Sequence, residues 1–357
     1  MPSLLLHIHL LLSLLLHLNS ASPVSLRVAP PTTCAVPAPS PSLPVRRVRF
    51  WVGANGAGGA SVVDRATNAS CTPYFLGNLS KYAPAVSSLG FEVWTLGANA
   101  TGPVATFNDG SSVDVGLGAC VNQLRALYPH IAIGLCGATS AGALGVAARQ
   151  PADYVAVLRA FFGRQTFTVD EVWTDFEVKS LSAGQTAGVN AMHALTQKEL
   201  LPTFRYAGCE PRDSPYFSEN CSAFVDAAPG VVVQASNTYW STTVSSGWYK
   251  GFAALLQQEI DNIGGASHLS ALSPSICPAC ATGGNADDAL TMEELYARMD
   301  IVCAQGISDF SAFTFFEIVQ GPHGVQDPQL GLTLSDRYFE ALSYYRWGVK
   351  GRVTGRI

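Results

Sequence analysis

One short segment near the middle of the chain places two carboxylates at a spacing that suits acid catalysis. The run Val169–Phe176 predicts a β-strand, and Glu177 follows it directly. Side chains alternate along a strand, so Trp173, Asp175 and Glu177 face one side. Two carboxylates at a partly desolvated strand end cannot both ionise cheaply, so one holds a proton at neutral pH, as a general acid requires. A solvated or salt-bridged strand end is the alternative interpretation, because Asp-x-Glu also occurs by chance.

The rest of the chain supplies regular elements that would hold this strand in place. Apolar, β-branched runs alternate with longer amphipathic segments after Arg46. Helix starts are marked by Pro151 and by the capping-box spacing of Ser182 with Gln185. The other predicted strands are Val48–Val52, Phe91–Leu96, Ile131–Leu135, Thr203–Ala207, Val231–Ala235, Leu269–Leu272 and Phe310–Phe316.

The alternation of eight strands with eight helices predicts an α/β fold, the (β/α)8 TIM barrel. Each pair of parallel neighbours needs a crossover helix, and a sheet of eight such units can close on itself. An open doubly wound sheet would show the same alternation, but no Gly-x-Gly-x-x-Gly follows the first predicted strand. In a barrel the functional site lies at the carboxyl ends of the strands, which is where Asp175 and Glu177 stand.

The strand around Asp175 resembles the fourth-strand motif of the family 18 glycoside hydrolases, the chitinases and endo-β-N-acetylglucosaminidases. That motif is Asp-x-x-Asp-x-Asp-x-Glu; here Asp170, Asp175 and Glu177 match, and Trp173 occupies the middle Asp position. The segment Ile133–Gly137 is loosely similar to the Ser-x-Gly-Gly strand of that family. The resemblance implies that Glu177 protonates the glycosidic oxygen and that the 2-acetamido carbonyl of the substrate attacks the anomeric carbon while Asp175 orients it. It implies no metal and no organic cofactor.

The chain also departs from that family at the expected sugar contacts. The family has Met-x-Tyr-Asp on the sixth strand, where this chain has Gln234-Ala235-Ser236-Asn237-Thr238-Tyr239-Trp240, so Tyr239 would act from a shifted position. The eighth-strand Trp of the family has only Phe315 or Phe316 as a counterpart. The predicted substrate-binding residues are Asp170, Trp173, Gln234, Asn237, Tyr239, Trp240, Phe316, Glu317, Glu210 and Trp94.

Several other activities are excluded or disfavoured by composition. The net charge of −5 and the scattered Lys and Arg residues leave no basic patch for nucleic acid. No His-x-x-x-His or Cys/His array has metal-ligand spacing, and Gly-x-Ser-x-Gly is absent.

Three hypotheses about function remain open. The first is a secreted glycosidase that acts on N-acetylglucosamine-containing glycans by substrate-assisted acid catalysis. The second is a lectin-like barrel that binds glycans without turnover; Glu177 favours the enzyme, whereas Trp173 and Ser236 favour the lectin. The third is a retaining glycosidase that pairs Glu177 with Glu317, if the two carboxyl groups stand about 5 Å apart.

The N-terminal region predicts export. Residues 1–22 have the apolar run and the small residues of a signal peptide, residues 23–45 form a Pro/Ser-rich stalk, and residues 46–357 form one barrel domain. No later run reaches the ~20 apolar residues of a spanning helix. We expect a secreted monomer whose partner is a glycan.

Cysteines and sequons fit an exported chain. Nine Cys residues suggest disulfides, and we pair Cys209 with Cys221 and Cys277 with Cys280. A zinc site built from these four is the alternative to the disulfides. Cys71–Cys120 is a third candidate pair, and Cys34 is the candidate for the odd cysteine. Sequons predict glycosylation at Asn68, Asn78, Asn99 and Asn220.

Overall fold

The computed structural model of this chain describes most of the predicted barrel region. Residues from Thr33 to Ile357 form one compact unit. The residues described are 34, 46–53, 62–63, 70–107, 112–139, 146, 149–175, 195, 206–208, 222, 225–226, 232–235, 252–276, 292–313, 334–348 and 350.

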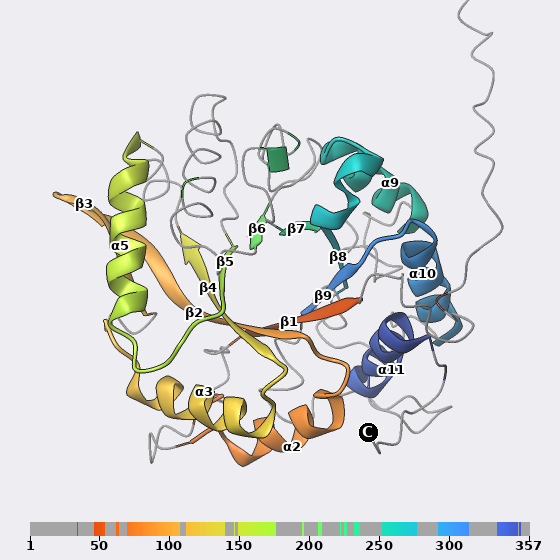
Figure 1. The fold of residues 1–357 in the computed structure, drawn as a ribbon, viewed down its shortest axis with the longest axis horizontal. Helices are drawn as coiled ribbons and strands as arrows, with labels where there is room; N and C mark the ends of the chain where they lie inside the picture. The colour runs from red at the N-terminus through yellow and green to blue at the C-terminus, as the bar shows by residue number, and fades with distance from the viewer. Residues whose placement is uncertain are drawn as a thin grey trace, which may run out of the picture. The chain divides into compact units, whose positions relative to one another are not determined.

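Eight of the described strands run parallel to their neighbours around a central ring (Figure 1). Their hydrogen-bonded order is β5-β4-β2-β1-β9-β8-β7-β6, and the two ends of this path, β5 and β6, also contact one another. This is the strand order of a (β/α)8 barrel, so the predicted fold is confirmed. The strands are β1 (Arg47–Gly53), β2 (Ser88–Asn99), β4 (Ala132–Thr139), β5 (Glu171–Asp175), β6 (Tyr206–Gly208), β7 (Val232–Ala235), β8 (Leu272–Ile276) and β9 (Asp309–Phe313).

Helices lie around the outside of the strands (Figure 1). Their starts follow from local chemistry: the side chains of Thr72 and Asp114 accept hydrogen bonds from the first turns of α2 and α3, and Pro151 opens α5 as predicted. No helix in the described part of the chain has the length and apolar character needed to cross a membrane. The helices are α2 (Pro73–Tyr82), α3 (Val115–Leu127), α5 (Pro151–Gly163), α9 (Phe252–Asn262), α10 (Met292–Ala304) and α11 (Leu334–Trp347).

One predicted strand is displaced along the chain. The apolar residues of Leu269–Leu272 were expected to form it, but Ala266–Ala271 is a 3₁₀ helix, and β8 begins at Leu272. The reason is the pair Gly264 and Gly265, which have φ of 98° and 88°. Only glycine adopts such φ values readily, so α9 ends there and the chain makes a further turn before it enters the sheet.

An additional strand that the sequence did not predict extends the sheet beside β2. Strand β3 (Gly102–Phe107) pairs antiparallel with β2 after a tight turn. In that turn the side-chain oxygen of Asn99 accepts hydrogen bonds from the backbone N–H groups of Thr101 (2.9 Å) and Gly102 (3.1 Å). Asn99 is exposed, as glycosylation requires; Asn78 lies on α2, and Asn68 and Asn220 lie outside the described residues.

The disulfides correct part of the cysteine assignment. Cys71 is bonded to Cys120, as predicted. Cys34 is bonded to Cys303 in α10 and is fully buried, so it is not the odd cysteine, and the predicted stalk is tied to the barrel at this residue. Among the described cysteines, the buried Cys136 is the one outside these two disulfides. The predicted pairs Cys209–Cys221 and Cys277–Cys280 lie outside the described residues.

Candidate functional site

Strand β5 directs two large side chains into the barrel interior. Glu171 and Trp173 are both buried, and the indole Nε1–H of Trp173 donates a hydrogen bond of 2.8 Å to Glu171. The indole lies across the neighbouring strands: a Cβ atom added to Gly90 of β2 or to Gly134 of β4 would meet it at 2.2 or 2.5 Å. Gly90 and Gly134 are paired in register, and together they leave a flat surface against which the indole packs. Any other residue at either position would place its side chain into the ring.

Glu171 belongs to a buried ion-pair network that crosses the barrel. The guanidinium of Arg49 on β1 donates to Glu171 at 2.6 Å and to both carboxylate oxygens of Asp309 on β9 at 2.8 and 3.0 Å. Ser88 donates to the same Glu171 oxygen at 2.6 Å, and Ser273 donates to Asp309 at 2.9 Å. Side chains from β1, β2, β5, β8 and β9 can meet in this way only inside the barrel.

The network fixes the charge of its members. Burial alone would raise the pKa of Glu171, but the charge of Arg49 and the hydrogen bonds from Ser88 and Trp173 outweigh it and hold this pKa below its usual value. Burial would likewise lower the pKa of Arg49, yet Asp309 and Glu171 raise it. Glu171 and Arg49 are therefore both ionised at neutral pH.

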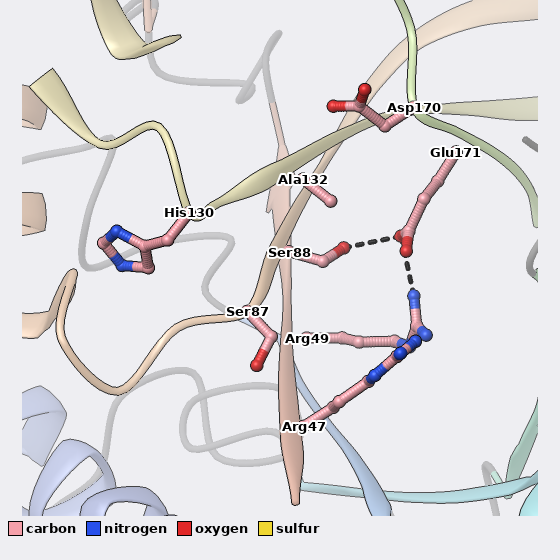
Figure 2. Close-up of a pocket in the computed structure, with 8 residues that line it drawn as sticks. All are labelled: Arg47, Arg49, Ser87, Ser88, His130, Ala132, Asp170 and Glu171. Carbon is pink, nitrogen blue, oxygen red and sulfur yellow. Dashed lines mark hydrogen bonds and ion pairs between the residues drawn. The ribbon is translucent and has the colours of Figure 1, made fainter. Parts of the chain in front are cut away.

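A cavity of about 320 Å³ opens next to this network (Figure 2). Every lining residue lies at or just before the amino end of β1, β2, β4 or β5, and in Figure 2 the Arg47 and Arg49 side chains both run towards Glu171. The cavity is therefore at the end of the barrel opposite to the predicted site, where side chains usually serve stability. The lining residues are Arg47, Arg49, Ser87, Ser88, His130, Ala132, Asp170 and Glu171.

Asp170, a predicted substrate contact, also lies at this amino end and not at the carboxyl ends of the strands. Its carboxylate accepts hydrogen bonds from the backbone N–H of Ile133 (2.8 Å) and from Arg125 of α3 (2.7 Å). Asp175 stands five positions further along the extended chain, a span of roughly 16 Å. Asp170 therefore joins β5 to β4 and α3 at the amino end of the barrel.

Trp94 is likewise not placed as a sugar platform. It is fully buried, its Nε1–H donates to the carbonyl of Leu135 (3.1 Å), and its ring packs against Phe161 and Phe162 of α5. A Cβ on Gly137 would meet the ring at 2.1 Å, so the indole lies on the outer face of the sheet. The register of β2 against β4 shifts between Glu92 and Trp94, so the side of the sheet on which Trp94 lies does not follow from alternation along the chain.

One member of the predicted catalytic pair, Asp175, stands at the other end of β5. Asp175 is the last residue of β5 and pairs with Ala138 of β4, and Gln234 stands next to last on β7. Both therefore lie at carboxyl ends of their strands, where a barrel carries its site. The other predicted site residues lie outside the described residues: Glu177, Glu210, Asn237, Tyr239, Trp240, Phe316 and Glu317.

Charge is distributed unequally between the two ends of the described strands. Among the last two residues of each of these eight parallel strands, Asp175 is the one charged residue, and no Lys or Arg occurs. At the amino ends, by contrast, stand Arg47, Arg49, Glu171 and Asp309. The sequence signal for the amino-end network is the pair of arginines inside an otherwise apolar first strand, which the sequence analysis did not use.

Comparison with known proteins identifies the fold as that of chitinase structures. No family model and no curated sequence matches the chain. A chitinase from Bacteroides thetaiotaomicron superimposes with a TM-score of 0.55 at 8% identity, covering 85% of this chain and 97% of that one. The Bacillus cereus spore cortex-lytic enzyme SleL gives 0.53 at 9% identity, with 86% and 76% covered.

A third solved structure carries a sugar. The GH18 chitinase from Cycas revoluta, a double mutant in complex with (GlcNAc)4, gives a TM-score of 0.52 at 11% identity and covers 84% of this chain and 99% of that one. At such low identities these likenesses establish the fold. They confirm the resemblance to family 18 at the level of the barrel, so the chain is a divergent, chitinase-like (β/α)8 barrel.

Proposed function

We propose that this protein is a secreted glycoside hydrolase that cleaves N-acetylglucosamine-containing glycans. The observation that carries the proposal is the orientation of β5, because Glu171 and Trp173 are buried inside the barrel. The rule that side chains alternate along a strand predicts the same inward side for Asp175 and Glu177, at the carboxyl end.

In this proposal Glu177 is the general acid and protonates the glycosidic oxygen. As that C–O bond breaks, the carbonyl oxygen of the 2-acetamido group bonds to the anomeric carbon, and Asp175 orients and stabilises this group. Glu177, now a carboxylate, takes a proton from the water that opens the cyclic intermediate. The chemistry requires no metal and no organic cofactor.

The charge distribution supports a protonated acid at neutral pH. No Lys or Arg stands among the last two residues of the described parallel strands, so none of those positions supplies a cation beside Asp175. Two carboxylates without such a partner disfavour each other's ionised form. The sugar complex of the Cycas revoluta chitinase, which shares the fold, supports the choice of substrate class.

A lectin-like barrel is the second candidate, and Trp173 favours it. The family motif has an Asp at this position, whereas here a fully buried indole is bonded to Glu171. Asp175 is thereby left with Glu177 as its predicted carboxylate neighbour on this strand, which would suit binding without efficient turnover.

Export is the part of the proposal that concerns the compartment. The Cys34–Cys303 and Cys71–Cys120 disulfides are typical of an oxidising environment. We propose that residues 1–22 are removed as a signal peptide, that residues 23–45 precede the barrel domain of residues 46–357, and that the product is a monomer.

The experiment compares two tetrasaccharides that differ at carbon 2 of each sugar. The N-acetylglucosamine tetrasaccharide carries the 2-acetamido group, and cellotetraose carries a hydroxyl group instead. We expect hydrolysis of the first only, with retention of configuration at the anomeric carbon. Hydrolysis of both would contradict substrate assistance and favour a retaining carboxylate pair such as Glu177 with Glu317. Binding of the first without hydrolysis would establish the lectin.

A further inference from the structure

We infer that the cavity at the amino end of the barrel binds a small zwitterion, a molecule that carries a carboxylate and an ammonium group a few bonds apart, as α-amino acids do. The walls that would recognise it include the side chains of Arg47, Arg49 and Glu171. This cavity lies at the opposite end of the strands from the predicted catalytic pair, so the inference does not depend on the proposed function.

The cavity has a buried floor and an open rim. Arg49, Ser88 and Glu171 form the floor and are at most 5% exposed, whereas Arg47 on the rim is exposed. Its volume of about 320 Å³ is at the lower end of the range for ligand pockets, roughly 300–1,000 Å³, so its ligand is small. All lining residues except Ala132 are polar or charged, and an apolar ligand would leave them unpaired.

Three side chains in these walls have hydrogen-bonding atoms that are not used. Arg49 donates through Nε and Nη1, and Glu171 accepts all its bonds through Oε2. Within the described part of the chain nothing pairs with Nη2 of Arg49, with Oε1 of Glu171 or with the Arg47 guanidinium, and none of these atoms is sealed from solvent. Both arginines run towards Glu171 in Figure 2, so a ligand in the cavity would meet donors and an acceptor together.

The balance of formal charge distinguishes a zwitterion from a simple anion. The buried network holds the positive charge of Arg49 against the negative charges of Glu171 and Asp309. Arg47, beside this network, supplies the positive charge that offsets the excess. An anion bound to Arg47 would cancel that offset next to a buried carboxylate, which is costly, whereas a zwitterion adds no net charge.

The unused atoms also assign the two ends of the ligand. The planar fork of a guanidinium matches a carboxylate, so the carboxylate of the ligand lies on Arg47 and on Nη2 of Arg49. The ammonium N–H groups then donate to Oε1 of Glu171, the open acceptor of the floor. Sugar hydroxyl groups could make the same contacts, but without the attraction between full charges.

The experiment titrates the full-length protein at pH 7 with four probes. Glycine carries both charged groups, betaine keeps the carboxylate but has no N–H, acetate has the carboxylate alone, and methylammonium has the cation alone. The Kd of each probe is measured by saturation-transfer difference NMR for the wild-type protein, Arg47→Met and Arg164→Met. Arg164→Met is the matched control, because it removes an exposed arginine that does not line the cavity. The unfolding midpoint of each protein checks the fold.

We expect glycine to bind about tenfold or more tightly than betaine, acetate or methylammonium, because each of these lacks a hydrogen bond to a charged group of the cavity. Arg47→Met should weaken glycine binding about tenfold, since it removes the open guanidinium. Arg164→Met should leave every Kd unchanged.

Three results would overturn the inference. The first is no binding of glycine to the wild-type protein, and the second is equal Kd values for glycine and acetate, which would indicate a site for anions. The third is unchanged glycine binding in Arg47→Met, which would place the ligand elsewhere. Should Arg47→Met not fold, Arg47→Lys decides: it keeps the charge but loses the planar fork, so glycine binding should weaken, and an unchanged Kd would overturn the inference.

Discussion

The two ends of the barrel interior differ in how their charges are matched. At the amino end, Arg49 lies within 3.0 Å of oxygens of both Glu171 and Asp309, and serines complete the hydrogen bonds. At the carboxyl end, Asp175 is the one charged residue among the last two residues of the described parallel strands. Glu171, at the amino end of β5, is therefore paired with an arginine. Near the carboxyl end, no Lys or Arg stands among the last two residues of the described parallel strands.

Under the proposed function, this difference separates the residue of β5 that stabilises the fold from the residue that takes part in the chemistry. A carboxylate that is paired with arginine stays ionised and cannot deliver a proton at neutral pH. A carboxylate beside a second carboxylate resists ionisation and can deliver one. Glu171 on β5 is of the first kind, and under the proposed function Asp175 with Glu177 would be of the second.

The largest expected effect on stability comes from disruption of the ion-pair network at the amino end of the barrel. Arg49→Met would leave Glu171 and Asp309 buried without their cation, which typically costs ~3–5 kcal/mol. The exposed Arg164 at the end of α5 provides the control, since Arg164→Met should change the free energy of unfolding by no more than about 0.5 kcal/mol. Urea denaturation measures both, and equal losses in the two variants would contradict the assignment of the network.

The second effect is a pH dependence that belongs to Glu171. Its pKa is lower in the folded protein than in the unfolded chain, so its ionised form stabilises the fold above the unfolded value of ~4.3. That stabilisation is lost as the pH falls through the folded pKa. The wild-type protein should therefore lose more unfolding free energy than Glu171→Gln does between pH 7 and pH 3. Urea denaturation at the two pH values measures this. Equal losses of unfolding free energy in the wild-type protein and in Glu171→Gln would show that its partners do not lower the pKa of Glu171.

A smaller effect tests the role of Asp170 at the amino end of the barrel. Asp170→Ala would leave the backbone N–H of Ile133 without its acceptor, which costs ~1–3 kcal/mol. Affinity for the N-acetylglucosamine tetrasaccharide, measured by calorimetry, should not change, because Asp170 lies at the opposite end of the strand. A large loss of affinity in a folded variant would restore Asp170 to the binding site.

The smallest effect concerns the surface. Asn99 is exposed in the turn between β2 and β3, so we expect it to carry a glycan in a eukaryotic secretory host. Mass spectrometry of tryptic peptides before and after glycosidase treatment decides this. Asn99→Gln should remove the modification and lower the free energy of unfolding by about 0.5–1.5 kcal/mol, because the hydrogen bonds of the Asn99 side chain in the turn are lost. Recovery of an unmodified Asn99 peptide would contradict the prediction.

The strand order could be predicted because apolar periodicity and helix starts repeat along the chain. Pro151 and the alternation along β5 are local signals, and both elements formed where they were expected. The displaced strand at Leu272 shows the limit, because Leu269 is as apolar as a strand residue and only the preceding glycine pair redirects the chain. The apolar pattern of a short segment does not show how many residues the preceding turn takes before the strand begins.

The candidate site could be predicted only in part, because its residues come from distant strands. Glu171 looked like a bystander in the motif, and nothing in its neighbours indicated that Arg49, 122 residues away, would pair with it. Asp170 matched a family pattern, yet its position is decided by the backbone of β4. Partners of charged residues therefore depend on register between strands, which the sequence does not reveal.

The most direct test of the central claim is the rate of hydrolysis of the N-acetylglucosamine tetrasaccharide by the wild-type protein and by Glu177→Gln. Glutamine keeps the shape of the side chain and loses the titratable proton, so turnover should fall ~10²–10⁴-fold while binding by calorimetry is retained. The exposed Glu293 on α10 supplies the matched control, because Glu293→Gln removes a carboxylate far from the chemistry and should keep full activity. Unchanged turnover in Glu177→Gln would contradict the account and move the acid to another residue, with Glu317 or Glu210 next to be tested.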